Sequence, residues 1–141
     1  MITRTANARW NGGLKDGNGT VALGSGAFSG QYSFTSRFEN GVGTNPEELI
    51  GAAHAGCFSM AFAGALERAG FKAESIATTA KVSIDKVDGG FKVVRIDLVT
   101  EAKVPGIDAA AFQEQAQGAK AGCPISKALA AVDITLDARL V

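Results

Sequence analysis

An uncharged stretch at residues 49–66 is the feature that most constrains how this chain can fold. It contains no Asp, Glu, Lys or Arg, and its apolar side chains point to every side of a helix, so the helix should be fully buried. Just before it, Thr44 and Glu47 have capping-box spacing with Pro46 between them, which predicts the start of this helix. We expect a long central helix that runs to about Gly70 and forms the middle of the core.

The same stretch reaches the lower length limit for a membrane span. His54, Ser59 and three glycines within it argue against that interpretation, so we expect no membrane association. Lys plus Arg equals Asp plus Glu, at 14 each, and this balance predicts no nucleic-acid binding. The first seven residues lack the apolar run of a signal peptide. We therefore expect a cytoplasmic protein whose cysteines are free thiols at rest.

The segments before the helix predict strands. Short alternating patterns near residues 6–10, 20–23 and 31–39 are separated by turns rich in Gly, Asn and Asp. In the third segment, Tyr32 and Phe34 share one face of the expected strand. This order is typical of a β-meander.

After the helix, residues 75–86 and 91–103 predict a β-hairpin that turns at residues 87–90. Asp108 can cap a short helix that ends near Gly118. A second short helix should begin at Cys123 and Pro124, and residues 132–140 alternate as a closing strand. The length of 141 residues fits one domain, residues 1–141, of the α+β class.

Two cysteines, Cys57 and Cys123, are the main candidates for chemistry. Free cysteines are most often small apolar residues of the core, which is the simplest interpretation. A structural disulfide would stabilise a loop of this size by roughly 4 kcal/mol in the chain-entropy model, but the expected cytoplasmic location argues against one. The single His and two Cys show no ligand-spaced cluster, so no metal site is predicted.

A reactive cysteine has to be a thiolate, and the two positions differ in how they could support one. Cys57 lies about three turns into the helix, where the helix dipole helps little and burial raises the pKa of a thiol. A cation must then be supplied, and arginine suits this role best. Glu47, nearly three turns before Cys57, could orient such an arginine. Cys123 lies at a helix N-terminus, where free N–H groups favour a thiolate.

Two other functions stay open. His54 precedes Cys57 by three residues on nearly the same helical face, so a Cys-His hydrolase or acyltransferase is conceivable. No third orienting residue is identifiable, and a structural histidine or one that lines a pocket fits better. A non-catalytic dimer that binds an apolar ligand is the other alternative.

The segments around both cysteines resemble the two signatures of the OsmC/Ohr family. The first spans residues 43–58, with Thr-Asn-Pro-Glu before the cysteine, and the second reads Ala-Lys-Ala-Gly-Cys-Pro-Ile-Ser at residues 119–126. The resemblance covers essentially the whole chain, with Gly56 as a small departure from an expected alanine, and residues 104–108 look like the osmotically inducible branch of the family. It implies a thiol peroxidase of oxidative and osmotic stress defence, folded as an intertwined homodimer with a buried central helix and sites at the subunit interface.

The resemblance also implies a role for each matching residue. Cys57 would attack the peroxide and Cys123 would resolve the product as a disulfide. Glu47 would hold a catalytic arginine, for which Arg37 is the candidate. No cofactor is implied. The implied substrates are organic hydroperoxides in preference to hydrogen peroxide, and the implied reductant is an external dithiol such as a lipoylated protein. An apolar entrance lined by Phe58 and Met60 would explain the preference for an alkyl group.

Overall fold

The computed structural model describes all residues, Met1–Val141, and divides into two compact units, Met1–Leu49 and Ile50–Val141. The first unit contains a three-stranded antiparallel sheet of β1 (Ala6–Asn11), β2 (Asn18–Leu23) and β3 (Ser29–Tyr32), in that order. This sheet confirms the predicted meander. Trp10 and Tyr32 flank Gly19 in the register, and their rings meet over its bare backbone with centroids 5.3 Å apart.

The strand predicted at residues 31–39 is wrong beyond Tyr32, because the chain turns there into helix α1 (Phe34–Phe38). Ser33 and Ser36 form a capping box in which each side-chain oxygen accepts a hydrogen bond from the backbone N–H of the other. Phe34 and Phe38, four residues apart, pack with ring centroids 5.0 Å apart. The cap and this pair outweigh the alternating pattern.

Helix α2 (Pro46–Arg68) has nearly the predicted extent, but its cap differs from the prediction. Asn45 Oδ1 accepts a hydrogen bond from the backbone N–H of Glu48 at 2.8 Å. Thr44 instead donates to the carboxylate of Glu48, and the predicted box between Thr44 and Glu47 is not formed. The Glu47 carboxylate is thereby free for another partner.

The second unit contains a three-stranded sheet in the order β4 (Ser75–Val87), β5 (Gly90–Lys103), β6 (Asp133–Leu140). Strands β4 and β5 form the predicted hairpin, and β6 pairs parallel to β5. Asp88 and Gly89 both have positive φ, at 51° and 83°, which is the geometry of a two-residue type I′ turn.

Two helices connect β5 to β6. Helix α3 (Ala109–Gly122) begins at the predicted cap, where Asp108 accepts from the backbone N–H of Ala111 at 2.8 Å. It continues past the predicted stop at Gly118, because a helix interior tolerates one glycine at a modest cost. Helix α4 (Pro124–Ala128) follows Cys123 directly, as expected.

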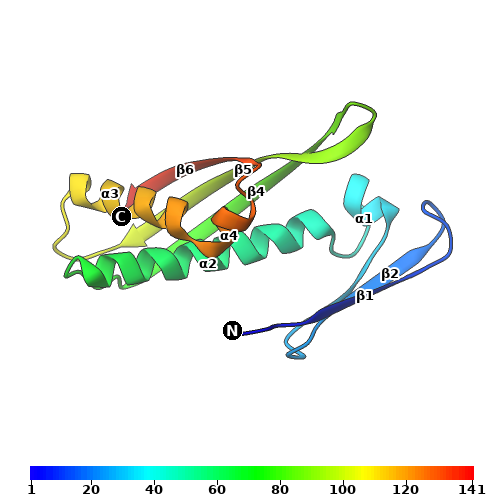
Figure 1. Ribbon diagram of the computed structural model, residues 1–141, viewed down its shortest axis with the longest axis horizontal. Coiled ribbons are helices and arrows are strands. Elements are labelled where there is room, and N and C mark those ends of the chain that lie inside the picture. Colours follow the sequence, from blue (N-terminus) through cyan, green and yellow to red (C-terminus); the bar gives the residue numbers. More distant parts are fainter. The chain divides into compact units, whose positions relative to one another are not determined.

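Helices α2 and α3 lie against the sheet of the second unit and form its core with it (Figure 1). The core residues are Phe58, Phe62 and Leu66 of α2, Ile96, Leu98 and Ala102 of β5, and Phe112, Ala116 and Ala119 of α3. The ring of Phe62 lies between Phe58 and Phe112, at centroid distances of 5.7 and 5.3 Å. The predicted α+β class is confirmed.

One face of α2 is not covered within a single chain. Phe58 and Phe62 are fully buried, but Ala53 and Gly56 are exposed and Met60 is 78% exposed. The expectation of burial on every side is therefore wrong for one chain. Helix α2 is long and apolar enough to cross a membrane. Core helices of water-soluble proteins can have the same length and composition.

Candidate active site

Helices α2 and α4 bring the two cysteines together. Cys57 lies in the middle of α2, and Cys123 immediately precedes α4. Both are free thiols, and their sulfur atoms are 2.7 Å apart although 66 positions separate them in the sequence. A disulfide has an S–S distance of about 2.05 Å, so a shift of roughly 0.7 Å would allow the bond to form.

Solvent access distinguishes the two sulfurs. Cys57 is partly exposed, whereas Cys123 has no exposed surface. A reagent that arrives from solvent therefore meets Cys57 first.

The pKa values of the two thiols move in opposite directions. Burial raises the pKa of Cys57, and its hydrogen bond with Cys123 raises it further. Burial also acts to raise the pKa of Cys123, but its interactions with the Cys57 thiol, with the amide and hydroxyl of Ser126 and with the Ile125 amide favour the thiolate and lower the value. No cation contributes to the pKa of Cys57, so a stable thiolate there needs a positive charge from outside this immediate surrounding.

His54 is not paired with Cys57. Its Nε2 atom lies 2.8 Å from Ser126 Oγ, and its Nδ1 atom is buried without a partner. The imidazole is fully buried, and this burial lowers its pKa and favours the neutral form. The Cys-His nucleophile that we considered is therefore not formed. Ser126 was missed as a site residue, and no local signal marked it, because its bond to His54 depends on how α4 packs against α2.

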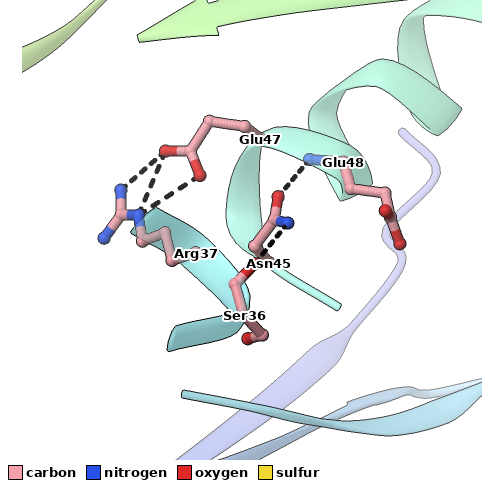
Figure 2. A network of polar contacts seen from close by, with 5 residues as sticks. All are labelled: Ser36, Arg37, Asn45, Glu47 and Glu48. Carbon is pink, nitrogen blue, oxygen red and sulfur yellow. Dashed lines mark hydrogen bonds and ion pairs between the residues drawn. The ribbon is translucent and has the colours of Figure 1, made fainter. Parts of the chain in front are cut away.

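The first unit places Arg37 beside Glu47 (Figure 2). Arg37 Nε lies 3.2 Å from each carboxylate oxygen of Glu47, and Nη2 donates to Oε1 at 2.7 Å. The Glu47 side chain is 9% exposed and that of Arg37 is 37% exposed. Asn45 Nδ2 donates to the carbonyl of Ser36, which ties the end of α1 to the start of α2. The guanidinium is thus fixed along one edge, and Nη1 has no hydrogen-bond partner in the structure.

An apolar cavity of about 250 Å³ adjoins Arg37 within the first unit. It is lined by Trp10, Leu14, Tyr32, Ser33, Phe34, Arg37 and Phe38. A cavity with mostly aromatic walls and one cation at its edge can hold an apolar group next to a polar or anionic one.

The two residues predicted to line the substrate entrance lie in different surroundings. Phe58 is fully buried in the core, and Met60 is exposed one turn after Cys57. Met60 and Gly122 line a second cavity, of about 330 Å³, between α2 and α3.

Comparison with known proteins agrees with both the motifs and the fold. Residues 38–137 match the family described as OsmC-like protein. Peroxiredoxin OsmC of Escherichia coli (strain K12) is 55% identical over 140 residues, which cover 99% of this chain and 97% of that protein. The organic hydroperoxide resistance protein of Xanthomonas axonopodis pv. citri is 35% identical over 99 residues, or 68% of this chain and 67% of that protein.

A solved structure shows the same fold. The crystal structure of the organic hydroperoxide resistance protein OhrB of Bacillus subtilis superposes with a TM-score of 0.72 at 27% identity, and the match covers 96% of this chain and 98% of that one. The predicted family resemblance is confirmed: this chain belongs to the OsmC family.

Proposed function

We propose that this protein is a thiol peroxidase that reduces organic hydroperoxides, and hydrogen peroxide more weakly, in oxidative and osmotic stress defence. The observation that carries the proposal is the pair of free thiols 2.7 Å apart, one open to solvent and the other fully buried. The peroxiredoxin and hydroperoxide-resistance names of its relatives support the same activity.

In the first step the Cys57 thiolate attacks the distal oxygen of the hydroperoxide. The O–O bond breaks, the alkoxide leaves with a proton as an alcohol, and Cys57 becomes a sulfenic acid. The partial exposure of Cys57 supports it as the attacking residue, because Cys123 has no accessible surface that a peroxide could reach.

In the second step the Cys123 sulfur attacks Cys57, a disulfide forms, and the sulfenic oxygen leaves as water. An external dithiol, for which we propose a lipoylated protein, then reduces the disulfide by thiol–disulfide exchange. Cys57, the more exposed of the two cysteines, is the one that we expect this reductant to attack.

We assign Arg37 as the cation that stabilises the Cys57 thiolate and Glu47 as the residue that orients it. The ion pair supports this assignment, because it fixes the guanidinium and leaves Nη1 available for an anion. Within the first unit, the aromatic cavity beside Arg37 suits an apolar group. Met60, exposed one turn after Cys57, is our candidate contact for the alkyl group of the substrate.

We further propose that the chain acts as one OsmC-like domain, residues 1–141, in a homodimer with its sites at the subunit interface. The uncovered apolar face of α2 supports a second copy as the partner that buries it. A reducing compartment, the cytoplasm, would keep the two thiols free between turnovers.

Single-cysteine variants test the proposal. Cys57→Ser should consume no peroxide, because the attacking sulfur is gone. Cys123→Ser should consume about one equivalent and stop, since the sulfenic acid then lacks its resolving thiol. Residual peroxide is measured with a dithiol present for Cys57→Ser and without one for Cys123→Ser, because an external dithiol would itself reduce the sulfenic acid. Sustained turnover by Cys57→Ser would refute the proposal.

A further inference from the structure

The buried pair of His54 and Ser126 has no part in the reaction of Cys57 with peroxide, yet it adjoins the other sulfur. His54 belongs to α2 and Ser126 to α4, and both side chains are excluded from solvent. Nε2 and Oγ are 2.8 Å apart, which is a strong hydrogen bond between neutral groups. Ser126 lies three residues after Cys123, in the first turn of the same helix.

Ser126 bonds the imidazole and lies three residues after Cys123, so it brings His54 close to the end of α4 that carries this sulfur. The hydroxyl favours the thiolate form of Cys123, together with the backbone amides of Ile125 and Ser126. In the resting state the Cys123 sulfur makes no capping hydrogen bond to α4, and the free N–H groups of the first turn stay available to a thiolate. A hydroxyl can accept a proton from one side while it donates its own to the other.

The unpartnered Nδ1 atom argues against a purely structural histidine. Buried polar atoms normally have a hydrogen-bond partner, and leaving one without a partner costs about 1–3 kcal/mol. A side chain that only joined α2 to α4 could do so without a second ring nitrogen that lacks a partner. A neutral imidazole, however, has a ring nitrogen that can accept a proton during a reaction and release it afterwards.

We propose that His54, acting through the Ser126 hydroxyl, is the base that takes the proton from Cys123 when this thiol attacks oxidised Cys57. This inference rests on the proposed peroxidase function and names the positioning residues of its second step. His54 touches Ser126 rather than the reacting sulfurs, so its effect is indirect.

The proton and the bonds balance in this step. The thiol proton of Cys123 passes to Ser126 Oγ as the Ser126 proton passes to His54 Nε2. The S–S bond forms and the S–O bond of the Cys57 sulfenic acid breaks. The departing hydroxide takes up the proton that the imidazolium releases and leaves as water. Burial opposes a lasting charge on His54, so the imidazole returns to its neutral form for the next cycle.

Single-turnover kinetics distinguish a His54 that accepts a proton from a His54 that only joins α2 to α4. His54→Gln keeps an amide that can hydrogen-bond Ser126 but cannot carry a proton, whereas His54→Ala loses both functions. Each variant is mixed with one equivalent of hydroperoxide, sulfenic acid is trapped with a dimedone probe, and disulfide is followed by the loss of free thiol. We expect both variants and Ser126→Ala to form the sulfenic acid and then to form disulfide at least tenfold more slowly than the unmodified protein.

Ser59→Ala is the matched control, because Ser59 is a partly buried hydroxyl of the same helix whose partners are Ala55 and Thr78. It should form disulfide at the rate of the unmodified protein. Disulfide formation at that rate in His54→Gln would overturn the inference and leave His54 as a link between helices. Failure of the unmodified protein to lose its free thiols after the hydroperoxide is added would instead overturn the proposed function.

A thiol titration gives a second and independent readout. In a Cys57→Ser background Cys123 is the only thiol, so its ultraviolet thiolate absorbance can be titrated without overlap. Adding Ser126→Ala should raise the pKa of Cys123, because the hydroxyl that favours the anion is lost. An unchanged titration would contradict the link between Ser126 and this sulfur.

Discussion

Cys57 and Cys123 lie side by side, yet solvent reaches only one of them. Their pKa values alone would favour Cys123 as the reactive thiol, since hydrogen-bond donors around the start of α4 lower its pKa while burial raises that of Cys57. Peroxide must contact the sulfur that attacks it, so access determines the order of the steps. An external cation on Cys57 is then a requirement of the proposed mechanism.

Removing Arg37 should therefore change the reaction in a specific way. Without the guanidinium the pKa of Cys57 rises, so the thiolate fraction falls at neutral pH and returns only at higher pH. We expect Arg37→Ala to react with cumene hydroperoxide at least tenfold more slowly at pH 7, and its rate to reach half of its maximum at higher pH than in the unmodified protein. Stopped-flow rates across a pH series measure both effects.

Arg95→Ala is a matched control, because Arg95 also pairs with a carboxylate, that of Asp97, but lies on β5, so its loss should leave the pH profile unchanged. Glu47→Gln should react at a rate between those of Arg37→Ala and the control, since the guanidinium keeps its charge but loses its ion pair. An unaltered profile in Arg37→Ala would mean that another cation acts on Cys57.

For individual residues, the sequence identified the candidate site residues but not the contacts that they make. The motif spacing identified Cys57, Cys123 and Glu47, and the family resemblance added Arg37. The hydrogen bond between His54 and Ser126 was not predictable, because it joins residues 72 positions apart and depends on how α2 and α4 pack.

Among the elements, the turn of the β4–β5 hairpin is the one that was best predicted from local chemistry. Asp88 and Gly89 adopt positive φ there, and the turn fixes the register of the two strands that carry much of the core. The turn therefore positions the sheet on which α2 and α3 pack.

Gly89→Ala should destabilise the protein by about 1 kcal/mol, because an added Cβ disfavours the left-handed backbone at φ 83°. Gly90→Ala is the control, since Gly90 has no positive φ and an added Cβ would meet no atom within 4 Å at either position. The urea concentrations at the unfolding midpoints of the two variants, measured at one protein concentration, are compared. Equal midpoints for the two variants would contradict the strained-turn explanation.

Helix α1 shows why local patterns fail for short elements. Phe34 and Phe38 fit one face of a helix, whereas Tyr32 and Phe34 fit one face of a strand, so five or six residues satisfy both periods. The reciprocal bonds of Ser33 and Ser36 decide between them. The consequence is functional, because Arg37 lies on this helix and not on a strand.

For the molecule as a whole, the uncovered face of α2 calls for a partner. The helix carries no charge between Leu49 and Leu66, but only 33% of its most apolar window is buried within one chain. The sequence could show that this helix must be covered and could not show what covers it. The parallel pairing of β6 with β5 was equally hidden, because strand direction depends on the path of α3 and α4.

We expect a dimer in solution, with a mass twice that of the 14.4 kDa chain, by sedimentation. Ala53→Glu places a charge on the exposed apolar face and should shift the protein towards monomer, because burying an unpaired carboxylate is costly. Ala130→Glu adds the same charge at an exposed position outside α2 and should remain dimeric. A monomer for the unmodified protein would contradict the proposed assembly.

The most direct test of the whole account is to map the oxidised thiols after a single turnover. The reduced protein is treated with one equivalent of cumene hydroperoxide, free thiols are blocked, and its peptides are analysed by mass spectrometry without reduction. The account predicts that one disulfide joins Cys57 to Cys123 within the same chain and that both free thiols are lost. Consumption of the peroxide with both thiols still free, or with Cys123 oxidised and Cys57 unchanged, would contradict it.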